Sequence, residues 1–124
     1  MAAFQPGGNY TAAAGADLTG KKYYIVKLDA SGNVVLASAA TDAILGVLNT
    51  EGKLGQSVDV VLLNGSGSFK VKTGGIIAKD AYITSDASGK AVATTASGNR
   101  VIGRAVATGA SGDIIEYFKS NEKY

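Results

Sequence analysis

The sequence repeats itself at an offset of 57 residues, and this repeat restricts the possible folds more than any other feature. Between residues 29–55 and 86–112, nine identities occur at this offset without a gap, pairing Asp29-Ala30-Ser31-Gly32 with Asp86-Ala87-Ser88-Gly89, Val35 with Val92, Ala39 with Ala96, Gly46 with Gly103, Gly52 with Gly109 and Gly55 with Gly112. Matched glycines and matched apolar positions indicate one backbone used twice. We expect residues 44–63 and 101–119 to superpose through a pseudo-twofold relation and the two copies to close on each other.

Short strands joined by tight turns are expected throughout, because the chain has 17 glycines, one proline and many Val, Ile and Thr residues. Candidate strands span residues 22–28, 33–37, 44–48, 58–63, 69–73 and 113–119. Asp29 and Gly32 favour a turn that joins the first two strands as a hairpin. The segment Asn64-Gly65-Ser66-Gly67-Ser68 predicts another hairpin, between 58–63 and 69–73. The fold class is therefore all-β, a small sandwich or barrel of short strands built from two similar halves.

The predicted domain organisation is one β domain over residues 21–119 with a loose segment at each end. Its half-units span about 22–63 and 79–119, and a strand at 68–73 bridges them. Residues 1–20 are small and polar apart from Phe4, Tyr10 and Leu18, so they predict a flexible N-terminal arm. Such an arm is either a disordered terminus or a segment that orders on a partner. Residues 120–124 predict a frayed tail.

Composition argues against most catalytic and metal chemistry. The chain contains neither cysteine nor histidine, so the usual general base and the commonest zinc ligands are missing. A net charge of +2 with dispersed basic residues gives no footprint for nucleic acid. No apolar run is long enough for a membrane span, and the N-terminus does not read as a signal peptide, which favours synthesis in a cytoplasm. We expect a protein without enzymatic activity, cofactor or metal.

Three local patterns have simpler explanations than a site. Residues 15–21 have phosphate-loop spacing, but Lys22 stands where a magnesium-binding Ser or Thr is needed. The Asp-Ala-Ser-Gly turns each offer one carboxylate, whereas a calcium site needs several converging oxygens. Asp59 and Glu116 occupy equivalent repeat positions and might form a glycosidase-like pair, but charges on strand surfaces are the ordinary interpretation.

From Gly20 to Lys119 the chain resembles the capsid decoration, or cement, proteins of tailed bacteriophages. The resemblance rests on Ile44-Leu45-Gly46-Val47, the Val-rich run from Val58 to Gly65, Asp86-Ala87-Ser88-Gly89-Lys90-Ala91-Val92, Ile102-Gly103-Arg104-Ala105 and Gly112-Asp113. The chain has Lys79-Asp80 where a Gly-Asp turn is expected. Lambda-type head decoration proteins are more distantly similar.

The resemblance implies a non-enzymatic protein of the virion, on the outer capsid surface, that stabilises the assembled head by bridging major capsid subunits. Its partner would be the major capsid protein of a phage head, with neither nucleic acid nor membrane involved. A homotrimer is implied, with a dimer as the alternative. The arm is then the candidate contact with the capsid, through Phe4, Gln5, Pro6, Asn9, Tyr10 and Leu18.

A carbohydrate-binding or fibre-base β module of a virion or cell surface is the main alternative. It would need exposed aromatic residues clustered in a groove. The chain has six tyrosines and no tryptophan, and Tyr23, Tyr24, Tyr82 and Tyr117 lie in or beside predicted strands. The sequence therefore supports this alternative only weakly.

Overall fold

A computed structural model describes Gln5 and residues 7–124, and this part of the chain contains ten β-strands and no helix. No segment of it could therefore cross a membrane as a helix. The strands are β1 (Asn9–Ala13), β2 (Ile25–Leu28), β3 (Val34–Leu36), β4 (Ile44–Leu48), β5 (Ser57–Leu62), β6 (Ser68–Lys72), β7 (Tyr82–Ser85), β8 (Ala91–Ala93), β9 (Arg100–Ala105) and β10 (Ile114–Lys123). The expected all-β class is confirmed.

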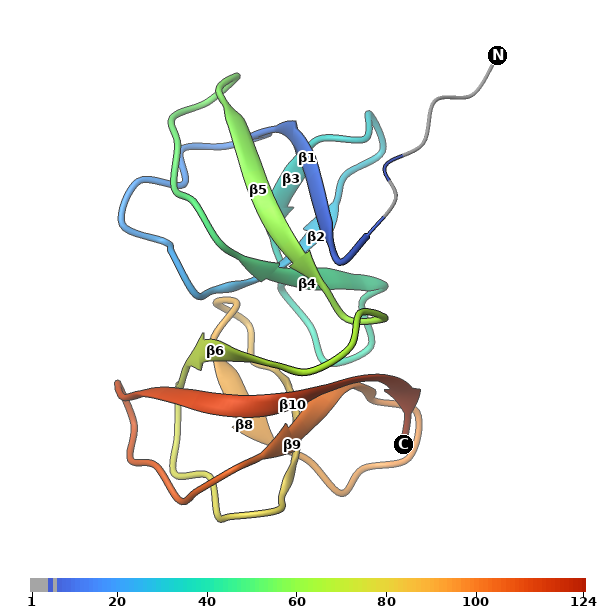
Figure 1. Ribbon diagram of the computed structural model, residues 1–124, viewed down its shortest axis with the longest axis vertical. Helices are drawn as coiled ribbons and strands as arrows, with labels where there is room; N and C mark the ends of the chain where they lie inside the picture. The colour runs from blue at the N-terminus through green and yellow to red at the C-terminus, as the bar shows by residue number, and fades with distance from the viewer. Residues whose placement is uncertain (1–4, 6) are drawn as a thin grey trace.

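Two five-stranded antiparallel sheets form two halves that lie one above the other in Figure 1. The strand order is β1-β5-β4-β2-β3 in the first sheet and β6-β10-β9-β7-β8 in the second, so each strand has an equivalent five places later. The offset is 57 residues from β2 to β7 and from β3 to β8, but 59 from β1 to β6. The duplication expected from the sequence is present, and the repeating unit has five strands.

Each sheet curls until its two edge strands approach each other. Isolated parallel bridges join Ala14 to Val34 in the first half and Thr73 to Ala91 in the second. The hairpin turns are also alike, because Asp29 Oδ1 accepts the N–H groups of Ser31 and Asn33 as Asp86 Oδ1 accepts those of Ser88 and Lys90. The expected β2–β3 hairpin is confirmed, and the matched turn sequences build matched turns.

The interiors of the halves are filled in different ways at equivalent positions. The first core contains Ala14, Leu18, Val26, Val34, Leu48, Val58 and Val60. In the second half Tyr117 replaces Val60, while Ala91 and Ala105 replace Val34 and Leu48. The smaller residues leave room for the tyrosine ring, so the packed volume is kept while its distribution changes. The Tyr117 side chain is fully buried, and its hydroxyl has no hydrogen-bond partner among the described residues.

The junction between the halves is apolar on the side of the first half. Ile25, Ala37, Val47 and Leu63 are buried and belong to the core cluster of the second half. Because side chains alternate along a strand, their neighbours Val26 and Leu48 point into the first core. Strands β2 and β4 are therefore buried on both faces. The Ile25 N–H also donates to the Gly89 carbonyl at 2.7 Å, and Lys72 N–H to the Tyr23 carbonyl at 2.9 Å.

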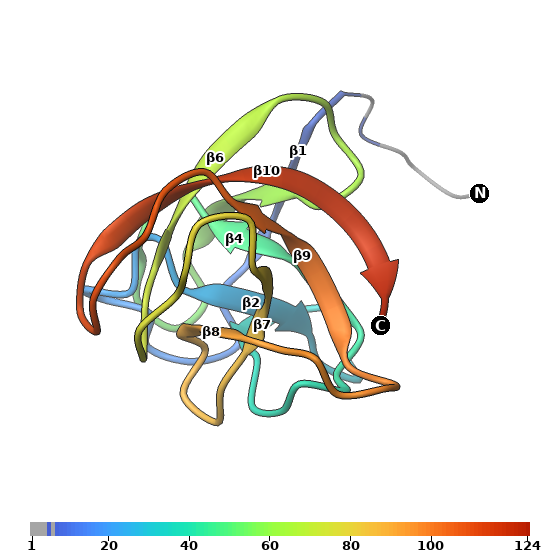
Figure 2. The same cartoon turned by 90° about the horizontal axis from the view of Figure 1, so that it is seen from below.

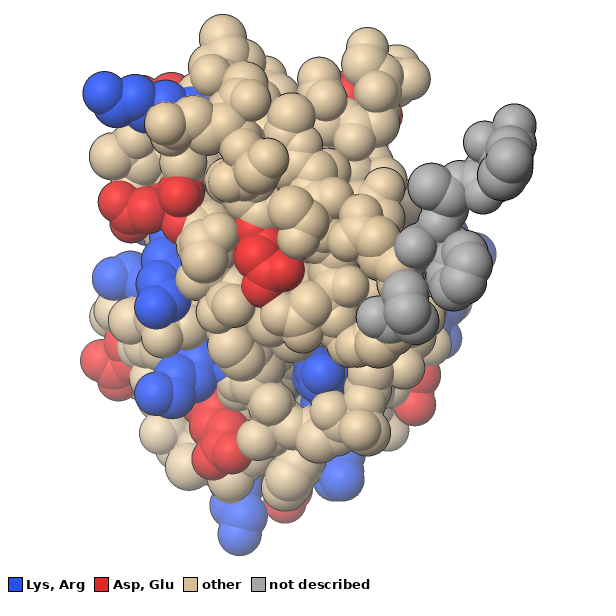
Figure 3. All heavy atoms as spheres, turned by 45° about the horizontal axis from the view of Figure 1, so that its top comes forward, with Lys and Arg blue, Asp and Glu red and all other residues tan. Residues whose placement is uncertain are grey.

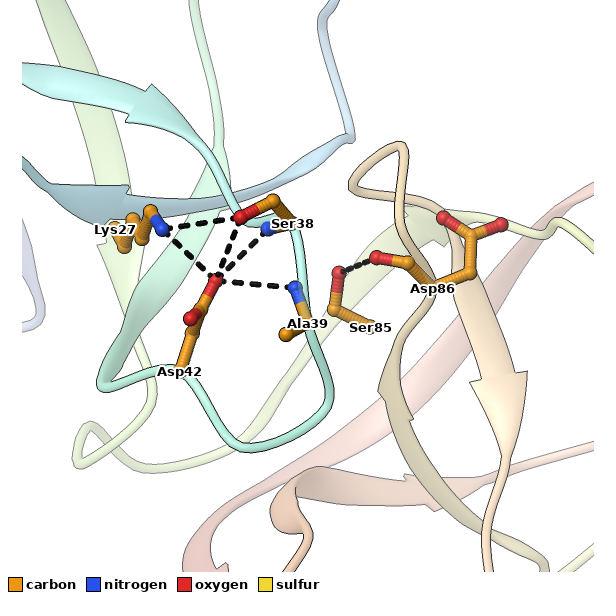
Figure 4. A network of polar contacts seen from close by, with 6 residues as sticks. All are labelled: Lys27, Ser38, Ala39, Asp42, Ser85 and Asp86. Carbon is orange, nitrogen blue, oxygen red and sulfur yellow. Dashed lines mark hydrogen bonds and ion pairs between the residues drawn. The ribbon is translucent and has the colours of Figure 1, made fainter.

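A loop between β3 and β4 adds polar contacts to this junction. The Ala40 carbonyl accepts the Arg100 N–H at 2.7 Å and the Thr84 hydroxyl at 3.3 Å. Figure 4 shows how Asp42 holds the loop, with one oxygen accepting from the N–H groups of Ser38 and Ala39 and from Lys27 Nζ. The Ser38 N–H holds the pKa of Asp42 below its ordinary value of 3.8, against the effect of burial. This stabilisation is present above the ordinary pKa and is lost as the pH falls through the folded-state pKa.

The halves are not related by a twofold axis, which corrects the expected pseudo-twofold relation. In a twofold interface equivalent residues make equivalent contacts. Here Ile25 and Val47 are buried in the junction, whereas their equivalents Tyr82 and Arg104 are exposed. The halves pack head to tail, with one surface of the first half against a different surface of the second.

Three other segments differ from the sequence-based expectation. Residues 9–18 are part of the first half and not of a loose arm, because β1 pairs with β5 from Asn9↔Val61 to Ala13↔Ser57 and Leu18 is 1% exposed. The predicted hairpin of 58–63 with 69–73 is absent, because β5 pairs with β1 and β4 while β6 pairs with β10. Residues 120–123 continue β10 beside β9 and do not form a frayed tail.

Replacing Gly46 or Gly103 by Val should lower the free energy of unfolding by about 1–3 kcal/mol. A Cβ at Gly46 would collide with the Val61 carbonyl, and one at Gly103 with the Phe118 carbonyl, across the neighbouring strand in each case. Urea unfolding of both variants measures the effect. Ala93→Val, at the exposed end of β8, is the control and should stay within about 0.5 kcal/mol of the parent.

Replacing Tyr117 by Phe should leave stability unchanged or raise it by up to about 1 kcal/mol. Burial raises the pKa of the Tyr117 phenol, and the hydroxyl recovers no hydrogen bond from the described residues. Thermal and urea unfolding give the difference. A loss of more than about 1 kcal/mol would show that the hydroxyl is hydrogen-bonded after all.

Candidate functional site

The outer edge of β1 is the part of the N-terminal region that is best suited to bind a partner. Strand β1 is the first in the order of its sheet, so only one of its sides pairs with β5. On the other side the Gln5 side-chain amide takes the place of a neighbouring strand. Its Oε1 accepts the Thr11 N–H at 2.7 Å, and its Nε2 donates to the Thr11 carbonyl at 2.8 Å. A primary amide offers the same donor and acceptor as a peptide group, so this edge can pair with an extended chain.

Polar side chains fix the surface beside this edge. Asp59 on β5 accepts from Asn9 Nδ2 at 2.7 Å and from Asn49 Nδ2 at 2.9 Å, and the Thr11 hydroxyl lies 3.4 Å from its second oxygen. The carboxylate is thus held by neutral donors and presents a rigid, amide-rich surface. Glu116 has the equivalent position in the second half, where Ser68 donates to it at 2.6 Å. The two carboxylates therefore belong to separate sheets, and each accepts from donors of its own half.

The structure brings some of the predicted contact residues together and separates others. Gln5 and Asn9 are exposed and lie along β1, as a surface contact requires. Tyr10 is half-buried, and Leu18 is in the first core. Phe4 and Pro6 lie outside the described residues. Sequence reasoning missed Thr11 and the role of Asp59, although the alternation of polar Asn9 and Thr11 could have indicated an outward strand face.

The surface around this region carries few charges. In Figure 3 its upper and central part is mostly uncharged, while Lys, Arg, Asp and Glu gather along the left side and the lower edge. Both signs are mixed there, so no single-sign field is evident in this view. Among the described residues, no group of three or more Asp or Glu is placed to hold a metal ion. The chemistry on offer is hydrogen bonding by backbone and amide groups.

Replacing Gln5 by Ala should increase hydrogen exchange at the Thr11 amide by about tenfold or more while shifting the melting temperature little. The Gln5 oxygen is the acceptor for this exposed N–H, and Gln5 packs in neither core cluster. Exchange measured by NMR tests this, with the β5 amides as an internal control. Unchanged exchange at Thr11 would show that the amide cap does not persist in solution.

Comparison with known proteins extends these observations. A family model described as phage cement protein matches residues 5–116. A solved structure, the head fiber gp8.5 N base in bacteriophage phi29, has a similar fold with a TM-score of 0.72, 19% sequence identity and coverage of 94% of this chain and 96% of that one. No curated protein matches the sequence. The family match spans both halves and the β1 edge, and the chain belongs to the phage cement protein family, whose members are structural components of the phage capsid.

Proposed function

We propose that this protein binds the outer surface of the assembled phage head and stabilises it by bridging neighbouring copies of the major capsid protein. The observation that carries the proposal is the β1 edge, where a single side-chain amide occupies the position of a pairing strand. An extended capsid segment can replace this amide and continue the sheet with main-chain hydrogen bonds. Such binding needs no deep pocket and no catalytic group.

The N-terminal segment and the β1 edge act together in this proposal. Phe4, Gln5, Pro6, Asn9 and Tyr10 remain proposed contacts, because they precede or lie within the strand that offers the edge. Leu18 is withdrawn from the contact set, because its burial in the first core leaves no surface for a partner. Among the described residues before β1, Gln5, Gly7 and Gly8 belong to neither core cluster, so a partner can replace the contact of Gln5 without disturbing the core.

Bridging of capsid subunits is possible if one oligomer presents several β1 edges. Each contact can be weak, because a second contact made by the same oligomer is intramolecular and gains from a high effective concentration. We propose a homotrimer, with a dimer as the alternative, as the unit that spans capsid subunits. The protein would be made in the host cytoplasm and would attach from outside.

A head-fibre base is the second candidate, and it is favoured by the likeness to the phi29 structure, which is the base of a head fiber. The likeness covers almost the whole of both chains. In this case the protein would still bind the capsid but would also carry a further fibre segment. Both candidates share the capsid contact, and they differ in what the outward side of the molecule holds.

Deleting residues 2–7 should leave the melting temperature nearly unchanged and weaken capsid binding by about tenfold or more. The deletion removes Gln5 but keeps Gly8, whose carbonyl accepts the Leu62 N–H at 2.9 Å, and all of β1. Co-sedimentation with expanded, undecorated capsids measures binding. A deletion of residues 2–19 is the contrasting variant and should unfold the first half, because it removes β1 and Leu18. Full binding by the shorter deletion would show that residues 2–7 make no contact of their own and that the β1 edge, which the deletion uncovers, binds the capsid alone.

A further inference from the structure

Two turns of identical sequence have opposite surroundings. The β7–β8 turn, Asp86-Ala87-Ser88-Gly89, reaches the first half at the junction, and the Gly89 carbonyl accepts the Ile25 N–H at 2.7 Å. Gly89 is buried, and a Cβ there would meet the Ile25 carbonyl at 2.9 Å. The β2–β3 turn, Asp29-Ala30-Ser31-Gly32, points away from the second half at the top of Figure 1. Gly32 is exposed, with nothing within 4 Å of a Cβ.

The surface that receives the docked turn also occurs twice, once covered and once open. In the first half it is formed by Ile25, Ala37, Val47 and Leu63, all buried by the second half. The equivalent residues of the second half are Tyr82, Thr94, Arg104 and Ser120, of which Thr94 is buried, Ser120 is half-buried and the other two are exposed. Tyr82 is 39% exposed and the Arg104 side chain 50% exposed. Figure 2, seen from below, looks toward β7, β9 and the end of β10, which carry this open surface.

The open surface has the residue types of a protein interface. Phe118 is 51% and Tyr124 45% exposed beside Tyr82, and the rings of Tyr82 and Tyr124 meet edge to face at 5.7 Å. Two shallow hollows of about 310 Å³ each lie here and share Tyr82 and Glu122. Phe118 and Arg104 line one of them, and Tyr124 lines the other. Tyr, Phe and Arg are enriched at the centre of interfaces between separately folded chains. The covered counterpart is purely aliphatic, as suits a permanent contact within one chain.

We propose that the β2–β3 turn of one copy docks on the β7-β9-β10 surface of a second copy, in the manner of the β7–β8 turn within the chain. The occupant is a second copy because each molecule presents both parts, a free turn and an open receiving surface. The contact within the chain serves as the template for this docking. Within the chain, the Ile25 N–H donates to the Gly89 carbonyl. Between copies, the Tyr82 N–H of one copy would donate to the Gly32 carbonyl of the other.

This association is head to tail, which limits the assemblies it can form. The turn and the receiving surface are different surfaces, so the contact is heterologous and either closes as a ring or extends as a filament. A dimer in which turn meets turn, or receiving surface meets receiving surface, is excluded for this contact. The inference concerns self-association and goes beyond capsid binding, so it stands or fails without any capsid present.

Sedimentation equilibrium over a concentration series up to about 1 mM tests the surfaces. The wild type should form oligomers, and Ser31→Arg on the free turn and Tyr82→Ala on the receiving surface should each weaken association by about 30-fold or more. Both positions are exposed, and circular dichroism checks that both variants remain folded. Ser111→Arg, in the exposed turn before β10, is the matched control and should associate as the wild type does. A wild type that is monomeric throughout, or oligomers that Ser31→Arg and Tyr82→Ala leave unchanged, would overturn the proposal.

Disulfide trapping tests whether the contact between copies is head to tail. It is feasible because the chain has no cysteine of its own. Within the chain the Gly89 position faces Leu36, whose equivalent is Ala93 on the open surface. On oxidation, a mixture of Ser31→Cys and Ala93→Cys chains should form mainly the disulfide-linked dimer of the two variants. The amount of this dimer should be at least about fivefold larger than the amount of dimer that either variant forms alone. Equal trapping of the like pairs would indicate a twofold contact and contradict the proposal.

Discussion

Burial of β2 and β4 on both faces is the constraint on which the rest of the molecule depends. Val26 and Leu48 fill the first core, while Ile25 and Val47 fill the junction with the second half. A chain of this size can bury only part of its surface, so sharing two strands between two cores makes economical use of its apolar residues. The junction also determines which surfaces of the two halves stay uncovered, and the β1 edge and the β7-β9-β10 surface are among them.

The repeat could be predicted because turn glycines and alternating apolar residues are local signals. Gly46 and Gly103 mark close strand approaches, and the Asp-Ala-Ser-Gly turns mark the hairpins. The equivalence of β1 and β6, the first strands of the two units, was not predicted. Its offset of 59 residues breaks the ungapped alignment, so Leu18 was not matched with its buried equivalent Ile77. Three of the five residues of β1, Asn9, Ala12 and Ala13, carry little strand propensity, and the place of β1 is set by backbone pairing with a strand far away in sequence.

The candidate site was predictable in part. The sequence indicates that Gln5 and Asn9 belong to a polar N-terminal segment, but not that the Gln5 amide caps Thr11 or that Asp59 gathers Asn9 and Asn49. These contacts join residues up to 50 positions apart. The wrongly predicted hairpin between β5 and β6 has the same origin, because a Gly-rich turn signal says nothing about which distant strands compete for each partner. The outcome depends on the sheet order, which no local pattern encodes.

The strand order also determines when each sheet can be completed during synthesis. Because β1 pairs with β5, the first sheet cannot close until the ribosome has released residue 62, and the second must wait for β10 near the C-terminus. A first half that formed in this interval would leave Ile25 and Val47 uncovered, because both pack against the second half. A neighbouring nascent chain could then reach the same apolar surface.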